Sequence, residues 1–224
     1  MSPTIISIEG NMGVGKTTFI NTLQGYFKDK RPIHILEEPV SLWQSIKDHS
    51  GKDILSHFYE NQSKWAFSFQ MMAYISRIAI LKQAIKDHPD SIIITERSVH
   101  SDRHIFAKML YDDKLINEID YQIYNQWFDH FIEDIPITGT IYLQCTPEIS
   151  NQRVLKRARK GETIPLPYLI KCHQYHEEWL DSTKADISTA PPILLVNCNL
   201  ENTPETILLW QQQLEQFISP LIIW

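Results

Sequence analysis

The sequence is poor in cysteine and glycine, and it contains no long apolar run and no excess of basic residues. Its three cysteines, Cys145, Cys172 and Cys198, are an odd number whose spacing fits neither a disulfide framework nor a zinc site. No apolar run approaches the ~20 residues of a membrane helix, so we expect no membrane association. Because 27 acidic residues outnumber 21 basic ones, the net charge is −6, whereas a nucleic-acid-binding domain usually carries a basic excess. A small-molecule partner is therefore favoured over nucleic acid.

The N-terminal segment and the composition indicate a globular protein of the cytoplasm. The first ten residues, MSPTIISIEG, have neither the pattern of a signal peptide nor that of a transit peptide. Hydrophobic residues make up 43% of the chain and charged residues 21%, close to globular averages. Because no repeat, low-complexity tract or linker interrupts the sequence, residues 1–224 are predicted to form one domain.

Short β-branched runs alternate with longer helical segments along the chain. The runs are apolar on both faces, as in a parallel sheet covered on both sides. We therefore predict a three-layered, doubly wound α/β fold with about five parallel strands flanked by helices. The predicted strands are Thr4–Ile8, Ile33–Leu36, Ser91–Thr95, Thr140–Leu143 and Ile193–Val196. The predicted helices are Thr17–Lys28, Asn61–Lys86, Val99–Leu110, Ile119–Ile132, Pro147–Lys160, Leu166–Ser182 and Pro204–Ile218.

The segment Gly-Asn-Met-Gly-Val-Gly-Lys-Thr at residues 10–17 matches the phosphate-loop pattern GxxxxGK[ST]. It follows a predicted strand and opens a helix, so its backbone amides and the helix N-terminus would face bound phosphates. Lys16 would reach the β- and γ-phosphates, and the hydroxyl of Thr17 would ligate Mg²⁺. The residues predicted to bind the nucleotide here are Gly10, Asn11, Met12, Gly13, Val14, Gly15, Lys16, Thr17 and Thr18.

A second acidic position supports a nucleotide site with a metal. Glu96 directly follows an apolar strand, where phosphate-loop proteins commonly hold Mg²⁺. A GTPase is disfavoured, because the DxxG pattern at Asp48–Gly51 does not end an apolar strand and no NKxD motif occurs. The remaining class is that of small-molecule kinases.

Five segments of the chain resemble the deoxynucleoside kinase family, which includes the deoxycytidine and deoxyguanosine kinases. They follow one another in the family's order between residue 4 and about residue 182. The segments are the phosphate loop, Glu38–Trp43, Tyr59–Arg77, Glu96–Arg103 and Arg153–Tyr168. The resemblance implies a P-loop kinase fold and an enzyme that transfers the γ-phosphoryl group of ATP, with Mg²⁺, to the 5′-hydroxyl of a deoxynucleoside. It also implies a homodimer.

The resemblance assigns the catalytic roles. Glu38 would be the general base, Arg97 would orient the 5′-oxygen, and Glu96 would lie near Mg²⁺. The basic cluster at residues 153–160 resembles an arginine-rich lid at about residues 153–165, in which Arg153, Arg157 and Arg159 neutralise the charge of the transferred phosphoryl group. Tyr59 and Glu162 are assigned to the sugar 3′-hydroxyl, although the lid is about one residue shorter here than in the family's better-known members.

The long predicted helix carries the base-recognition residues. Gln70 and Arg77 are seven residues apart and therefore lie on one face about 10 Å apart. The family's Gln binds the base edge, and its Arg pairs with the aspartate that matches Asp102. Trp43, Phe69 and Phe106 would pack around the base, unless they are plain core residues. By resemblance to the family, a charged pair at residues 77 and 102 implies deoxycytidine, deoxyadenosine or deoxyguanosine as substrates and thymidine as a poor one.

Two other functions remain open from the sequence alone. One is a thymidine-directed or broad-specificity nucleoside kinase on the same fold, and the other is a nucleotide-binding regulatory subunit without turnover. Two histidine pairs, His100/His104 and His173/His176, have helical spacing but lack the glutamate and third ligand of a zinc site. We expect these histidines at a surface or an interface.

Overall fold

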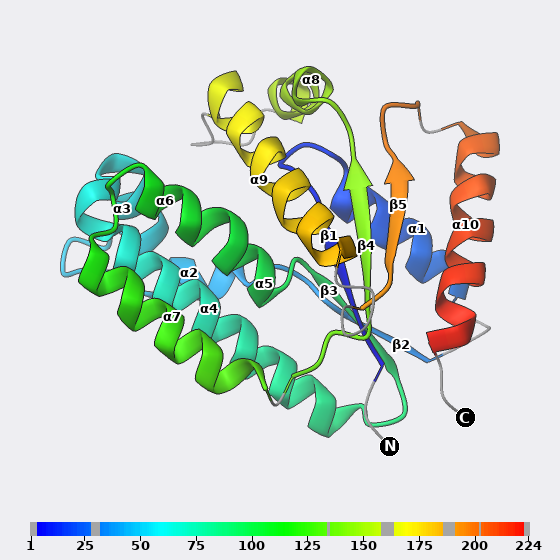
Figure 1. The fold of residues 1–224 in the computed structure, drawn as a ribbon, viewed down its shortest axis with the longest axis horizontal. Helices are drawn as coiled ribbons and strands as arrows, with labels where there is room; N and C mark the ends of the chain where they lie inside the picture. The colour runs from blue at the N-terminus through cyan, green and yellow to red at the C-terminus, as the bar shows by residue number, and fades with distance from the viewer. Residues whose placement is uncertain are drawn as a thin grey trace.

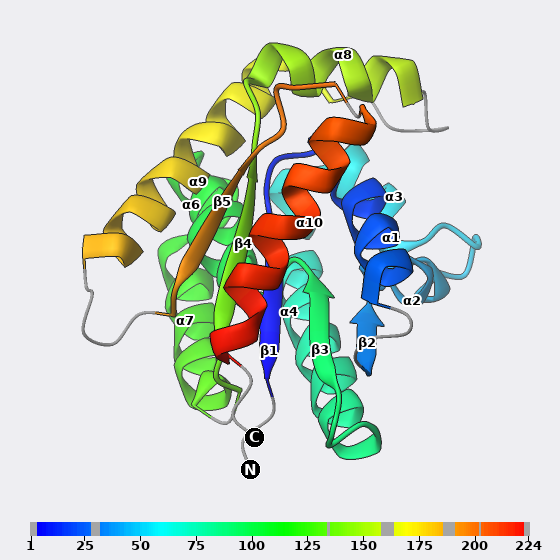
Figure 2. The same cartoon turned by 90° about the vertical axis from the view of Figure 1, so that its right-hand side faces the viewer.

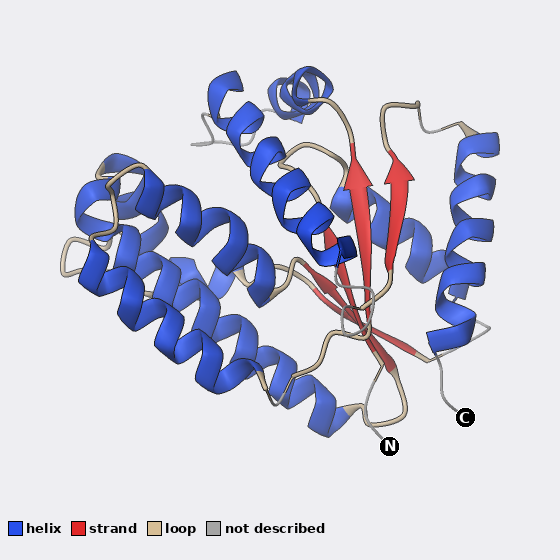
Figure 3. Ribbon diagram, in the orientation of Figure 1, coloured by secondary structure: helices blue, strands red, loops and turns tan. Residues whose placement is uncertain are grey.

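A computed structural model of the chain describes residues 4–27, 32–133, 135–157, 164–185, 191–201 and 203–221. One sheet of five parallel strands runs through these residues in the order β2-β3-β1-β4-β5 (Figure 1, Figure 3). Each strand lies within one residue of its predicted bounds, so the α/β prediction is confirmed. The strands are β1 (Ile5–Glu9), β2 (Ile33–Leu36), β3 (Ile92–Glu96), β4 (Gly139–Gln144) and β5 (Ile193–Asn197).

Helices cover both faces of the sheet (Figure 1, Figure 2). On one face, α1 (Lys16–Phe27) and α10 (Pro204–Ile218) pack on the even-numbered side chains of β1, such as Ile6 and Ile8. On the other face, α4 (Gln62–Asp87) and α7 (Glu118–Ile132) pack in the cluster that contains Ile5. The side of α4 and α7 also carries α9 (Leu166–Ala185), and α8 (Pro147–Arg157) lies across the carboxyl ends of the strands.

The carboxyl ends of three neighbouring strands bring the predicted site together. Because parallel strands end at one edge of the sheet, ligands bind outside that edge. The phosphate loop follows β1, Glu38 lies two residues after β2, and Glu96 and Arg97 lie at the end of β3. These strands are adjacent in the order β2-β3-β1, so the three motifs become neighbours.

Several helices differ from the predicted ones. Two short helices, α2 (Val40–Ser45) and α3 (Ile54–Glu60), lie where no helix was predicted. The predicted helix at 99–110 is divided into α5 (Val99–Ser101), the π-helix η1 (Asp102–Ala107) and α6 (Lys108–Asp112). Such π-helical turns are frequent at functional sites. No helix in the described ranges is both long enough and apolar enough to cross a membrane.

Candidate active site

The phosphate loop packs tightly against its neighbours. Gly10 has a φ of +145°, and a Cβ there would lie 2.5 Å from the carbonyl oxygen of Leu143 at the end of β4. Gly13 has a φ of +79°, and its Cβ would lie 2.4 Å from the carbonyl oxygen of Ser150 in α8. Both positions therefore require glycine, for conformation and for space. The close approach sets the loop directly under α8.

Lys16 turns back onto this loop. Its Nζ donates to the carbonyl oxygens of Gly10 and Asn11, each at 3.1 Å. Burial and the nearby charge of Arg97 together lower the pKa of Lys16 to about 7, although the charges of Glu96 and Glu38 oppose the shift. Phosphate oxygens next to Nζ would favour the charged form, because an opposite charge raises the pKa of an amine.

Asn11, one of the residues predicted to bind the nucleotide, stabilises the loop instead. The side chain of Asn11 donates from Nδ2 to the carbonyl oxygen of Leu169 in α9 at 2.8 Å and accepts from the amide of Met12 at 2.8 Å. Asn11 and Gly10 do not line the cavity of the site, whereas residues 12–18 do. The Asn11 side chain therefore ties the loop to α9 and leaves phosphate contacts to the following residues.

Thr17 and Glu96 offer oxygen ligands beside the loop. The Thr17 hydroxyl lies 3.4 Å from both carboxylate oxygens of Glu96. Mg²⁺ prefers oxygen ligands and is usually held by one or two protein groups together with substrate phosphates and water. This pair therefore fits Mg²⁺ next to a bound nucleotide. No group of three or more histidine, cysteine, aspartate or glutamate side chains suits a metal ion elsewhere in the described chain.

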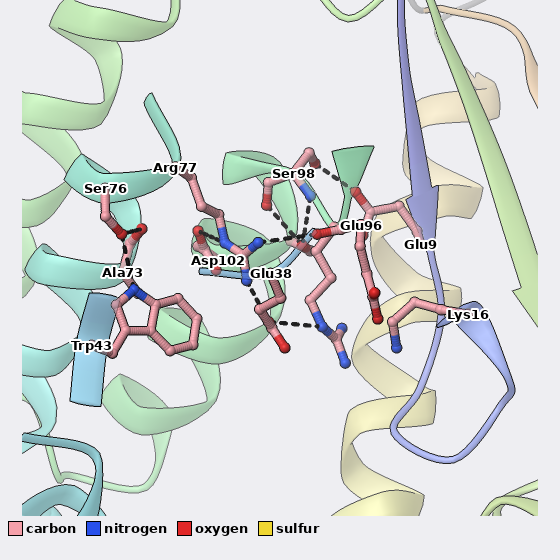
Figure 4. A network of polar contacts seen from close by, with 12 residues as sticks. Glu9, Lys16, Glu38, Trp43, Ala73, Ser76, Arg77, Glu96, Ser98 and Asp102 are labelled. Carbon is pink, nitrogen blue, oxygen red and sulfur yellow. Dashed lines mark hydrogen bonds and ion pairs between the residues drawn. The ribbon is translucent and has the colours of Figure 1, made fainter. Parts of the chain in front are cut away.

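Glu38 lies between two arginines, Arg77, which is labelled in Figure 4, and Arg97. Arg77 Nη2 donates to Glu38 Oε1 at 2.5 Å, and Arg97 Nε lies 3.6 Å from the same oxygen. Burial would raise the pKa of Glu38, but the charges of Arg77, Arg97 and Lys16 outweigh it and hold this pKa below its usual value. Glu38 is therefore an ionised carboxylate at neutral pH, fixed on the same rim as the phosphate loop.

Arg77 also forms the predicted pair with Asp102. Arg77 Nε lies 3.0 Å from Asp102 Oδ2, and both side chains are buried. Arg77 Nη1 donates to the carbonyl oxygen of Glu96 at 3.0 Å. Burial raises the pKa of Asp102 to about 6 although Arg77 opposes the shift. The pKa of Arg77 is raised because its two carboxylate partners outweigh burial. The sequence analysis predicted that Arg77 pairs with Asp102, but it did not predict that the same guanidinium binds Glu38.

Aromatic rings and a glutamine from α2, α3 and α4 form one wall of the site, which we call the far wall. Trp43 contacts Phe69 edge-on with ring centres 5.5 Å apart, and Phe69 stacks on Phe58 at 4.5 Å. Gln70 is 3% exposed, and its Oε1 has no hydrogen-bond partner within the described ranges. A buried amide oxygen without a partner is costly, so its place in this wall fits a ligand that donates a hydrogen bond to it. Phe58 was missed because it lies on α3, which has no clear sequence periodicity.

One cavity of about 1010 Å³ connects these groups. Most of the described residues predicted for catalysis or binding line it, and they come from elements far apart in the sequence. They are residues 12–18, Glu38, Trp43, Tyr59, Phe69, Gln70, Arg77, Glu96, Arg97, Asp102, Phe106, Arg153 and Arg157. Arg159 and Glu162 lie outside the described residues, as do residues 158–163 of the predicted lid.

The described part of the predicted lid belongs to α8 and contacts the phosphate loop. Arg153 Nη1 donates to the carbonyl oxygen of Val14 at 3.1 Å, and Nη2 donates to that of Leu200 at 3.4 Å. Arg153 therefore joins α8 to the loop, with Arg157 one helical turn further along the cavity wall.

One histidine contradicts its predicted position. His176 is fully buried, not at a surface, and its ring stacks on Tyr142 with centres 5.9 Å apart. His104 stacks on Trp179 at 5.6 Å. Helical spacing alone did not show that α9 packs these rings against the sheet and the π-helix.

Comparison with known proteins places the chain in a family. The family model described as deoxynucleoside kinase matches residues 6–219. Human deoxycytidine kinase is 36% identical, and the match covers 96% of this chain and 91% of the relative. The mitochondrial deoxyguanosine kinase of Xenopus laevis is 34% identical over 86% and 80% of the two chains, and the human mitochondrial thymidine kinase 2 is 30% identical over 97% and 78%. On this evidence, and with the P-loop kinase fold described above, the chain belongs to the deoxynucleoside kinase family and is a nucleoside kinase.

Proposed function

We propose that this kinase transfers the γ-phosphoryl group of ATP to the 5′-hydroxyl of deoxycytidine, deoxyadenosine or deoxyguanosine, with thymidine a poor acceptor, and that it serves nucleotide salvage. Family membership supports phosphoryl transfer from ATP to a deoxynucleoside. The base preference is carried by a single observation, the buried ion pair between Arg77 and Asp102 next to the unpartnered Oε1 of Gln70.

In this proposal Glu38 acts as the proton acceptor. Phosphoryl transfer requires positioning and charge neutralisation more than covalent chemistry. As the 5′-oxygen bonds to phosphorus and the bond to ADP breaks, the hydroxyl proton passes to the Glu38 carboxylate. Arg97, which lies 3.6 Å from that carboxylate, would hold the same 5′-oxygen.

Cationic groups surround the place where negative charge develops. Lys16 in the loop and Arg153 and Arg157 on α8 line the phosphate end of the cavity, and we propose that Arg159 joins them. Preorganised donors of this kind are a large part of catalysis, because they need no reorganisation during the reaction. Thr17 and Glu96 would hold Mg²⁺, which would supply further positive charge to this end of the site.

The base preference follows from the space and charge at the far wall. The relatives act, by their names, on deoxycytidine, deoxyguanosine or thymidine, so membership alone does not select a base. Arg77 and Asp102 fill the volume beside the base with an ion pair, where a thymine 5-methyl group would be in contact with buried charges. Gln70 can offer its amide to the base edge, with Trp43 and Phe69 packed along the ring. Tyr59 and Glu162 are proposed for the 3′-hydroxyl.

A panel of the four natural deoxynucleosides tests this proposal. Each is supplied singly with ATP and Mg²⁺, and the monophosphate formed is quantified. Product from deoxycytidine or the purine nucleosides, with little from thymidine, is the expected result. If thymidine is the best acceptor, the base preference is wrong and the kinase assignment stands. If no acceptor reacts, the chain is a regulatory nucleotide-binding subunit or acts on another acceptor.

The proposed homodimer is supported by an apolar stripe on α7. Ile119, Ile123 and Trp127 are 70%, 37% and 46% exposed and occur every fourth residue, on one helix face. Helix α4 packs beside α7 (Figure 1). It exposes Ile75 to 49%. Large apolar side chains gathered on neighbouring helices are typical of protein interfaces.

Location in the cytoplasm remains a prediction. Two of the three relatives named above are mitochondrial by name. Fractionation of cells that express the chain, with a mitochondrial marker alongside, tests the prediction directly.

A further inference from the structure

Glu9 is a fully buried carboxylate that the proposed mechanism does not use. It is the last residue of β1, directly before the phosphate loop, and its side chain is 0% exposed. Its Oε1 accepts a hydrogen bond of 2.6 Å from the hydroxyl of Ser98, as Figure 4 shows. Burial raises the pKa of Glu9, while the Ser98 hydrogen bond and the charges of Arg97 and Arg77 oppose that shift. A buried polar group of this kind is costly unless it is hydrogen-bonded.

The residue before Ser98 has a strained backbone. Arg97 has a φ of +65°, in the left-handed region that residues other than glycine adopt at a cost. Such conformations persist where the surrounding structure fixes them, and they cluster at active sites. Contacts from elsewhere in the fold must therefore hold the turn at residues 97 and 98 in this conformation.

Strand β1 holds this turn at two consecutive residues. The amide of Arg97 donates to the carbonyl oxygen of Ile8 at 3.0 Å, and Ser98 donates to the carboxylate of Glu9. The backbone bond fixes the distance between the strands, and the Glu9 bond fixes the direction in which the chain leaves Arg97. Consecutive residues of β1 thus bind consecutive residues of the turn.

The left-handed turn determines where the guanidinium of Arg97 lies. In this conformation Arg97 Nε is 3.6 Å from Glu38 Oε1, and its guanidinium lies 4.8 Å from the ring centre of Phe106. Another backbone conformation at Arg97 would move its side chain relative to Glu38. The arginine that we assign to the 5′-oxygen therefore depends on a contact with the strand that carries the phosphate loop.

We propose that Glu9 is a positioning residue for phosphoryl transfer, which acts through the Ser98 hydroxyl to hold Arg97 against Glu38. The inference rests on the proposed function. It places one carboxylate at the junction between the phosphate loop and the acceptor end of the site, so that the donor and acceptor substrates are held relative to one another.

The test uses four variants of the full chain with the best acceptor of the nucleoside panel. Ser98→Ala removes the donor and is expected to lower kcat at least tenfold, while KM for the nucleoside changes less than threefold because Ser98 itself does not line the cavity. Glu9→Ala removes the acceptor and should match it. Glu9→Gln retains an acceptor oxygen and should stay within about fivefold of the wild-type kcat.

Ser7→Ala is the matched control. Ser7 lies on the same strand and is buried, and its hydroxyl bonds to that of Thr140 at 3.2 Å, away from the turn. Its kcat should stay within twofold of wild type even if its thermal unfolding midpoint falls as far as that of Ser98→Ala. Wild-type kcat in Ser98→Ala, or an equal loss in Ser7→Ala or Glu9→Gln, would overturn the inference. A wild-type chain inactive on every nucleoside contradicts the proposed function instead.

Discussion

The indole nitrogen of Trp43 donates a hydrogen bond of 2.9 Å to the hydroxyl of Ser76, which donates in turn to the carbonyl oxygen of Ala73 at 2.9 Å. Both side chains are buried, at 5% and 8% exposed. The bond joins the short helix α2, which follows Glu38, to the base-binding helix α4 (Figure 4). It also sets the indole 5.4 Å from the guanidinium of Arg77. One hydroxyl thus fixes the wall against which a base would pack.

Replacement of Ser76 by alanine should weaken acceptor binding. The indole N–H loses its buried hydrogen-bond partner, which costs about 1–3 kcal/mol. The side chain of Trp43 should therefore become more mobile. We expect KM for the nucleoside to rise about three- to tenfold with kcat within twofold, measured by steady-state kinetics. Ser45→Ala is the control, because the Ser45 hydroxyl bonds the carbonyl oxygen of Leu42 on the exposed side of α2. Equal KM values for the two variants would contradict the prediction.

This hydrogen bond also shows what sequence reasoning misses. The period of the long helix correctly placed Gln70 and Arg77 on one buried face, because the positions of side chains along a helix follow from its geometry. The partner of Ser76 comes from residue 43, in a six-residue helix without a periodic pattern. Contacts between short elements depend on tertiary packing, which no local pattern encodes.

The Arg77–Asp102 pair should control the acceptance of thymidine. Replacing Arg77 with Met and Asp102 with Ala removes both charges and opens space beside the base. We expect the double variant to gain at least tenfold in kcat/KM for thymidine relative to wild type, an effect of about 1.4 kcal/mol. Arg77→Met alone is the comparison, because it leaves Asp102 buried without its partner. Its free energy of unfolding should be about 3–5 kcal/mol lower than that of wild type. Unchanged thymidine activity in the double variant would remove the specificity argument.

Glu38→Gln should abolish most turnover without loss of fold. The amide cannot accept the 5′-hydroxyl proton, and general-base catalysis typically contributes about 10²- to 10⁴-fold. We expect kcat to fall by that factor, with the nucleoside still bound in isothermal titration calorimetry. Glu37→Gln changes the adjacent, exposed carboxylate and should leave kcat within twofold. A Glu38→Gln variant with wild-type kcat would revive the regulatory-subunit alternative.

A charge on the α7 stripe should separate the proposed dimer. Trp127→Glu places a carboxylate among exposed apolar side chains, where an interface would have to bury it at high cost. We expect sedimentation velocity to show dimer for wild type and monomer for the variant at equal concentration. Gln212→Glu adds the same charge at an exposed position of α10, which packs on the opposite face of the sheet from α7, and should remain dimeric. A monomeric wild type contradicts the proposal.

The motifs and the sheet could be predicted because both depend on local sequence. The phosphate loop requires glycines at Gly10 and Gly13 that no other residue can replace, and buried parallel strands are continuous apolar runs. The roles of Glu9 and Ser98 could not be predicted in this way. They are 89 residues apart and become partners only because β1 and β3 are adjacent in the sheet. A buried carboxylate at the end of an apolar strand resembles any other strand terminus until the neighbouring strand is known.

His176 should make the fold sensitive to acid. Its Nδ1 lies 2.6 Å from the carbonyl oxygen of Cys172, and burial, together with the charges of Arg97 and Lys16, lowers its pKa to about 3. The unfolded chain, with a histidine pKa of about 6.5, binds the proton first. Stability is therefore complete above pH 6.5 and falls as the pH drops toward 3, by about 2 kcal/mol at pH 5 for this one histidine. Between pH 7 and pH 5, the His176→Phe variant should lose correspondingly less stability than wild type, as measured by denaturant unfolding. His49→Gln, at an exposed position, should keep the wild-type slope, and equal slopes for wild type and His176→Phe would contradict the prediction.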